Sequence, residues 1–121
     1  MKIAIIYDSL TGNTKVIAEQ IKKQVSEDEL VFIGKATQQV EADLYFIGSW
    51  TDKGVSSAPI QNFLKQLKNK KIAYFGTAGF ASEEYFASLC QRATSCIDSS
   101  NEVFSCFFVK ERCPYKQKSI I

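Results

Sequence analysis

Five short apolar runs recur along the chain, separated by amphipathic or polar segments. The runs are Ile3 to Tyr7, Leu30 to Ile33, Leu44 to Ile47, Ile72 to Phe75 and Val103 to Val109. They are rich in β-branched and aromatic residues, and the first has no polar alternation, which is typical of strands buried on both faces of a sheet. We therefore expect five strands, the third and fourth of them ended by Gly48 and Gly76.

Three of the intervening segments show helical periodicity, with apolar residues recurring on one face. Their apolar positions are Ile17, Ala18, Ile21 and Val25; Ile60, Phe63, Leu64 and Leu67; and Phe86, Leu89, Cys90, Ala93 and Ile97. The first helix should start near Asn13, Pro59 suits the start of the second, and Ser82 can cap the third. The remaining crossover, Lys35 to Ala42, has room for only about two helical turns and should be irregular.

This alternation predicts a doubly wound α/β fold, a three-layer sandwich with a five-stranded parallel sheet between layers of helices. We expect one domain over residues 1–121, with residues 110–121 as an irregular tail. The tail is mostly polar and contains Pro114, so the C-terminal helix should be absent or rudimentary. One sheet face would then stay uncovered, and we expect a second copy, giving a homodimer, or a partner protein to cover it.

Composition argues against several function classes. A net charge of +2 and a pI near 8.3 fall short of the basic surface of a nucleic-acid-binding protein. The chain has no His, and Cys90, Cys96, Cys106 and Cys113 are too widely spaced for a metal site, so we expect no metal and reduced thiols. No apolar run approaches the ~18 residues of a membrane span, and the chain opens on a strand. We therefore expect no membrane contact and a cytoplasmic location.

The segment between the first strand and the first helix carries the strongest candidate chemistry. Its residues are Ser9, Leu10, Thr11, Gly12, Asn13 and Thr14. A helix N-terminus leaves N–H groups unpaired and carries partial positive charge, the hydroxyls add donors, and Gly12 allows close approach. The segment lacks the Gly-Lys-Ser/Thr ending of a Walker loop and the three glycines of a dinucleotide fingerprint. On these residues alone, it either holds one terminal phosphate or is an ordinary capped turn.

From Ile5 to Ile21 the sequence resembles the FMN phosphate signature of the flavodoxin family, and the strand and helix order from Lys2 to Val109 agrees with that family. The resemblance implies FMN as the cofactor and the strand order 2-1-3-4-5. It also implies the residues that bind the phosphate. These are Ser9, Thr11, Asn13 and Thr14 through side chains and backbone, with Leu10 and Gly12 contributing N–H groups.

Two further loops should lie at the same sheet edge and hold the flavin ring, as they do in flavodoxin-like proteins. They comprise Ser49, Trp50, Thr51, Asp52, Lys53 and Gly54 after the third strand, and Thr77, Ala78, Gly79 and Phe80 after the fourth. Trp50 is the only Trp and lies among polar residues, so we expect it to stack on the ring, with Phe80 or Tyr85 at the other face. Gly54 would let a peptide rotate, so that a carbonyl accepts the N–H that the ring gains on half reduction.

These features predict an FMN-binding electron-transfer protein that shuttles electrons between redox partner proteins, with no catalytic residue of its own. Stacking and the absence of nearby cations would disfavour the anionic, fully reduced ring. Two alternatives remain open, an FMN-dependent reductase of a small quinone or flavin substrate and an interaction module without stable flavin, so whether the chain is an enzyme stays undecided. Carriers of this family are typically strongly acidic, so the partner of this slightly basic chain is expected to differ in kind.

Overall fold

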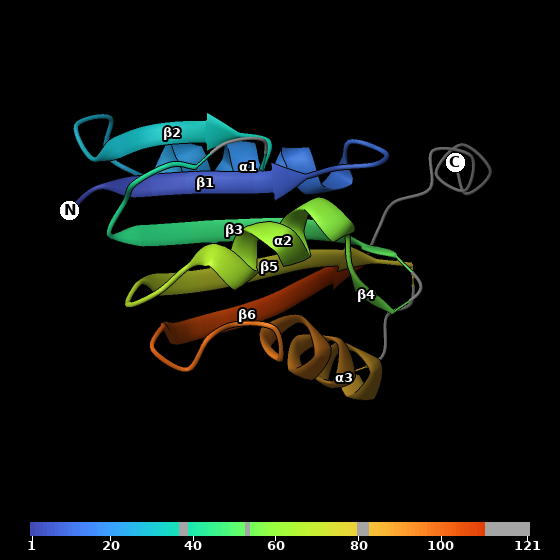
Figure 1. Ribbon diagram of the computed structural model, residues 1–121. Helices are drawn as coiled ribbons and strands as arrows, with labels where there is room; N and C mark the ends of the chain where they lie inside the picture. The colour runs from blue at the N-terminus through green and yellow to red at the C-terminus, as the bar shows by residue number, and fades with distance from the viewer. Residues whose placement is uncertain (37–38, 53, 80–82, 111–121) are drawn as a thin grey trace, which may run out of the picture.

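The computed structural model describes residues 1–36, 39–52, 54–79 and 83–110 (Figure 1). Its strands are β1 (Ile3–Asp8), β2 (Leu30–Gly34), β3 (Leu44–Asp52), β4 (Val55–Ser56), β5 (Lys71–Ala78) and β6 (Glu102–Lys110), and its helices are α1 (Asn13–Gln24), α2 (Ala58–Gln66) and α3 (Glu83–Thr94). Five strands run parallel in the order β2-β1-β3-β5-β6, while the two-residue β4 pairs antiparallel with the end of β3. The predicted order 2-1-3-4-5 is therefore confirmed, with β4 as an addition.

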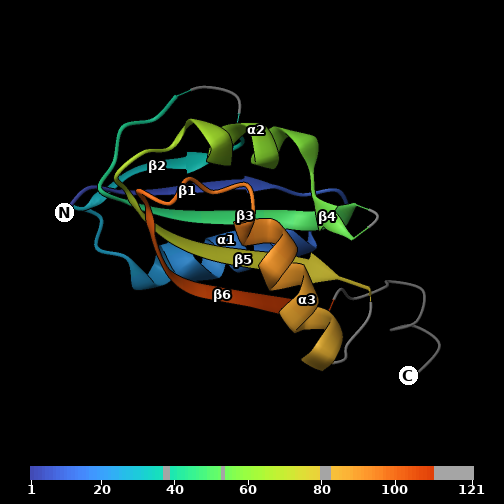
Figure 2. The same cartoon turned by 60° about the horizontal axis from the view of Figure 1, so that its bottom comes forward.

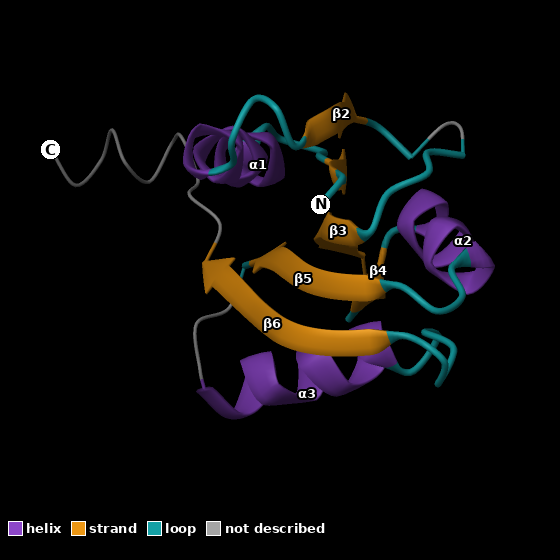
Figure 3. Cartoon of the chain, turned by 90° about the vertical axis from the view of Figure 1, so that its left-hand side faces the viewer, coloured by secondary structure: helices purple, strands orange, loops and turns teal. Residues whose placement is uncertain are grey.

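The helices lie on both faces of the sheet (Figures 2 and 3). On one face, Ala18 of α1 packs against Ile5 and Phe75. On the other face, α2 and α3 cover a larger core that includes Tyr74. This arrangement confirms the doubly wound three-layer fold. No helix within the described residues is long and apolar enough to cross a membrane.

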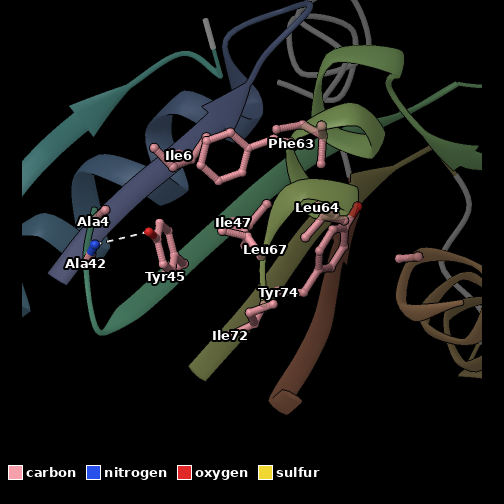
Figure 4. Packing of buried hydrophobic residues seen from close by; sticks show 12 residues of the cluster. Ala4, Ile6, Ala42, Tyr45, Ile47, Phe63, Leu64, Leu67, Ile72 and Tyr74 are labelled. Carbon is pink, nitrogen blue, oxygen red and sulfur yellow. Dashed lines mark hydrogen bonds between the residues drawn. The ribbon is translucent and has the colours of Figure 1, made fainter. Parts of the chain in front are cut away.

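Two buried tyrosines anchor the core beneath α2 (Figure 4). The hydroxyl of Tyr45 accepts a hydrogen bond from the backbone N–H of Ala42 at 3.0 Å and donates one to the carbonyl of Val40. This pair fixes the crossover before β3 without a helix, and the described residues of that crossover contain none. The hydroxyl of Tyr74 lies 2.7 Å from Oγ of Ser56, and burial raises the pKa of Tyr74 well above its usual range, so the phenol stays neutral.

The two glycines expected to end strands do not do so. Gly48 continues the pairing of β3 with Phe75, and Gly76 continues the pairing of β5 with Phe108. A Cβ atom at Gly48 would lie 2.1 Å from Cε2 of Phe75, and one at Gly76 would lie 2.3 Å from Cε2 of Phe108. The absence of a side chain at each glycine therefore makes room for an aromatic ring from the adjacent strand, Phe75 of β5 over Gly48 and Phe108 of β6 over Gly76. The expected strand ends were wrong, and Ser49 to Asp52 are strand residues.

The face that carries α1 remains partly open along β6. Phe104, Phe107 and Val109 are exposed there, although the ring of Phe107 stacks on that of Phe75 with centroids 6.2 Å apart. Among the described residues, α1 is the only helix on this face. The strand extends to Lys110, and the rest of the expected irregular tail lies outside the described residues.

Replacing Gly48 by Ala should destabilise the fold. The new methyl group would overlap the fully buried ring of Phe75, and overpacking of this kind costs about 1–3 kcal/mol of unfolding free energy. Urea unfolding followed by circular dichroism measures the change. Gly79→Ala is the matched control, because a Cβ atom there has no heavy atom of the described residues within 4 Å apart from its chain neighbours. Equal unfolding midpoints for the wild type and Gly48→Ala would contradict the packing argument.

Candidate functional site

The turn from β1 into α1, residues 9–14, forms what we call the phosphate cup. Gly12 adopts a left-handed conformation with φ of 95°, which favours glycine, and its carbonyl accepts the first helical hydrogen bond from Val16 at 3.1 Å. Oγ of Ser9 accepts hydrogen bonds from the backbone N–H groups of Gly12 at 3.0 Å and Lys15 at 3.3 Å. Ser9 therefore holds the turn closed across the start of the helix.

The outer rim of the cup carries two more polar side chains. The amide of Asn13 donates a hydrogen bond to Oγ1 of Thr11 at 2.8 Å, and Thr11 and Leu10 are exposed. The first turn of α1 contains no acidic residue, and Gly12 at the N-cap supplies no side-chain hydrogen bond. No acidic side chain in the first turn of α1 therefore offsets the positive end of the helix dipole.

Thr14 faces the interior. It is 1% exposed, and its hydroxyl lies 3.0 Å from the hydroxyl of Thr77 on β5. The carbonyl of Thr77 in turn accepts a hydrogen bond from the hydroxyl of Thr51 on β3 at 2.7 Å. We call this series of contacts the threonine chain. It joins the phosphate cup, the end of β5 and the end of β3 into one sheet edge.

Trp50 lies at this edge and is half-buried. Its indole N–H donates a hydrogen bond to Oδ2 of Asp8 at 3.0 Å. Asp8 ends β1 and pairs in register with Ser49, the residue before Trp50. Asp8 was not predicted to be a site residue, although its place at the end of the first apolar run signals that it reaches this edge.

Ser49 is fully buried and engaged within the protein. Its hydroxyl accepts a hydrogen bond from the backbone N–H of Ser57 at 2.9 Å, and it is placed to donate to the carbonyl of Trp50 at 2.6 Å. Ser57 is the N-cap of α2, so Ser49 links the end of β3 to the start of that helix.

The segment after Trp50 is a tight β3–β4 hairpin, in which Thr51 pairs with Ser56 and Asp52 with Val55. Gly54 has φ of 86°, and its carbonyl accepts a hydrogen bond from Nη1 of Arg92 on α3 at 3.2 Å.

Arg92 was not predicted to belong to this site, and nothing in the α3 sequence signals its contact with the hairpin. Lys53 lies outside the described residues. The hairpin is thus held from β5 by the threonine chain and from α3 by a cation.

The end of β5 supplies the last predicted residues. Ala78 is buried, and Gly79 is exposed. Phe80 lies outside the described residues, while Tyr85 is a half-buried residue of α3. That Phe80 or Tyr85 faces the second side of a flavin ring therefore stays a prediction.

The donor set of the phosphate cup fits a phosphate group. Ser9 and Thr11 offer hydroxyls, Asn13 an amide and the start of α1 its backbone N–H groups, all of which suit an anion at a helix N-terminus. The described residues contain no group of three or more His, Cys, Asp or Glu side chains that could hold a metal ion. This edge therefore presents hydrogen-bond donors that suit an anion, beside the aromatic side chain of Trp50.

Two curated proteins resemble the chain closely in sequence. Both are described as "Flavodoxin-like domain-containing protein BilS". The one from Clostridioides difficile (strain CD3) is 40% identical in an alignment that covers 88% of this chain, and the one from Clostridium symbiosum (strain WAL-14163) is 34% identical in an alignment that covers 79%. The chain spans 64% and 60% of the lengths of these relatives.

Solved structures share the fold at lower identity. A flavoprotein from Lactobacillus acidophilus NCFM in complex with FMN superposes with a TM-score of 0.68 at 19% identity, covering 88% of this chain and 92% of that one. The two-electron reduced flavodoxin of Megasphaera elsdenii gives a TM-score of 0.66 at 21% identity, covering 94% and 89%. The family model described as "Flavodoxin domain" matches residues 4–119. The chain therefore belongs to the flavodoxin family.

Proposed function

We propose that this chain binds FMN and passes electrons between redox partner proteins. The observation that carries the proposal is the threonine chain of Thr14, Thr77 and Thr51, because it fixes the phosphate cup and the β3–β4 hairpin to the end of one central strand. Ligands of open α/β sheets bind at this edge. Family membership and the FMN complex of the Lactobacillus acidophilus flavoprotein support the choice of flavin.

In this proposal the cup binds the phosphate. Oγ of Ser9 already accepts two N–H hydrogen bonds, which leaves its own proton to donate to a phosphate oxygen. Thr11 and Asn13 add donors at the rim, and the first turn of α1 adds backbone N–H groups. Thr14 acts from below through its contact with Thr77, so its side chain positions the helix start.

The ring would lie against Trp50 and the hairpin. The hydrogen bond to Asp8 fixes the plane of the indole, so a flat apolar surface is prepared before the ring arrives. When bound, FMN supplies one-electron redox chemistry that amino-acid side chains lack. The residues of the chain bind the ring, exclude water from it and set the charge around it.

Arg92 changes the expectation for that charge. From the sequence we expected no cation near the ring loops, whereas Nη1 of Arg92 donates a hydrogen bond to the carbonyl of Gly54 at 3.2 Å. A fixed positive charge beside the hairpin favours the anionic, fully reduced ring. The same bond restrains the peptide that follows Gly54. We propose that Arg92 raises the potential at which the second electron is accepted.

Partner proteins would approach the same edge. The net charge of +2 gives weak long-range steering, so recognition would depend on contacts around the site. The chain spans 64% and 60% of the lengths of its two curated relatives. The redox partners of the whole protein are therefore stated here as a proposal. A homodimer through the open face beside Phe107 is a second prediction about partners.

Stepwise anaerobic reduction of the FMN-loaded protein, followed by absorbance, tests the carrier function. We expect two separate one-electron steps, because a carrier must exchange single electrons. A single two-electron step would instead favour a reductase of a small substrate. Failure to bind FMN at micromolar protein would contradict the proposal and favour an interaction module.

The double substitution of Ser9→Ala and Thr11→Ala should weaken FMN binding at least about tenfold, because a hydrogen bond to a charged group contributes about 1.5–3 kcal/mol. Quenching of flavin fluorescence measures the dissociation constant. Ser26→Ala is the control, since Ser26 is an exposed hydroxyl in the turn before β2, at the opposite edge of the sheet. An unchanged dissociation constant in the double variant would remove the phosphate cup from the account.

Substituting Arg92 by Gln should make the potential of the second electron more negative, by an amount on the order of tens of millivolts for a solvent-facing charge. Arg92→Lys should retain most of the wild-type potential, because it keeps the charge. Lys68→Gln removes an equal charge that pairs with Asp98 at 3.0 Å, away from the hairpin, and should leave the potential unchanged. Equal shifts for Arg92→Gln and Lys68→Gln would show that only net charge matters.

A further inference from the structure

Two cysteines meet where α3 packs on β6. Cys90 lies on α3 and Cys106 on β6, and their Sγ atoms are in direct contact, 2.7 Å apart. Both residues are free thiols and half-buried. Neither cysteine belongs to the residues proposed above to hold the flavin.

The surrounding packing holds the two thiols in place. Cys106 pairs in register with Tyr74 and packs on the core beneath α2 and α3. One turn before Cys90, the ring of Phe86 stacks on that of Phe108, with centroids 6.0 Å apart. Because α3 is already seated on β6, the entropy cost of bringing the two sulfur atoms together is met by folding.

Other roles for the pair find less support. The described residues contain no group of three His, Cys, Asp or Glu side chains, so a metal centre lacks further ligands. Cys96 is the other described cysteine. Its Sγ donates a hydrogen bond to the carbonyl of Ala93, near the end of α3, at 3.4 Å. Of the three cysteines that the structure describes, Cys90 and Cys106 are therefore the two whose sulfur atoms are in contact.

We propose that Cys90 and Cys106 form a thiol–disulfide exchange site, which low-molecular-weight disulfides oxidise to an intramolecular disulfide between α3 and β6. In the first step the Cys90 sulfur attacks the small disulfide, forms a mixed disulfide and releases one small thiol, which takes up the Cys90 proton. In the second step the Cys106 sulfur displaces the second small thiol, which takes up the Cys106 proton. Two protein thiols are oxidised, and one small disulfide is reduced to two thiols.

The order of the two steps follows from the surroundings of Cys106. Burial, together with the adjacent Cys90 sulfur, raises the pKa of Cys106 well above that of an ordinary thiol. Cys106 is therefore a poor first nucleophile at neutral pH, because the thiolate is the reactive form. Once Cys90 carries a mixed disulfide, its neighbour needs to move little to attack it.

The disulfide would change the mechanics of the fold. It would close a covalent loop from Cys90 to Cys106 that includes the end of α3 and most of β6. A cross-link of this kind restricts the unfolded chain and stabilises the folded state. The oxidised protein should therefore unfold at a higher urea concentration than the reduced protein.

The test treats the full chain carrying Cys96→Ser and Cys113→Ser, which leaves only the proposed pair, with glutathione disulfide under native conditions. We expect both thiols to disappear, the protein mass to fall by that of two hydrogen atoms, and dithiothreitol to reverse both changes. With Cys106→Ser added, a stable mixed disulfide on Cys90 should accumulate. With Cys90→Ser added, Cys106 should react far more slowly.

Peptide mapping of the oxidised wild-type chain keeps the proposal testable if that variant fails to fold. A cross-linked peptide joining Cys90 to Cys106 supports the proposal. Two results would overturn it: both thiols remaining free in the folded protein while they react in urea, or a disulfide that pairs either of them with Cys96 or Cys113.

Discussion

The hydrogen bonds of one buried threonine determine where the parts of the site lie. Thr77 is 1% exposed and contacts Thr14 through its hydroxyl and Thr51 through its carbonyl. Its two partners belong to different elements, the first turn of α1 and the end of β3, so moving Thr77 would displace both. A buried hydroxyl pair is also costly to leave unsatisfied, which gives this edge a single arrangement. Buried contacts of Thr77 therefore position the start of α1 and the end of β3, the two elements that carry the candidate site.

Much of the fold could be predicted because it follows from periodicity. The five apolar runs and three helical stripes yield a parallel sheet with helices on both faces without tertiary information, whereas the strand order was implied by the resemblance to the flavodoxin family. The strand ends could not be predicted, because Gly48 and Gly76 resemble turn residues in sequence. Their place beneath the rings of Phe75 and Phe108 depends on which strands are neighbours. A glycine between apolar residues can either end a strand or make room for a neighbouring ring, and only the packing distinguishes these two interpretations.

The candidate site was predictable to a similar extent. The phosphate cup is contiguous in sequence, but its residue types alone fit either an anion site or an ordinary capped turn, and the resemblance to the flavodoxin family favours the first. The contacts that support it join distant positions, such as Asp8 with Trp50 and Arg92 with Gly54. Helix α3 makes two such long-range contacts, through Cys90 to Cys106 on β6 and through Arg92 to Gly54 in the hairpin. No local pattern records which strand or hairpin a helix side chain will meet, which is why Arg92 was missed.

We propose that the N-terminus of α1 binds the phosphate of a flavin mononucleotide. Calorimetric titration of one protein preparation with FMN and with riboflavin, which lacks the phosphate, measures what that phosphate contributes to binding. We expect FMN to bind at least about tenfold more tightly, because helix N–H groups and hydroxyls contribute only when an anion is present. Equal affinities for the two flavins would contradict the account and leave residues 9–14 as an ordinary turn into a helix.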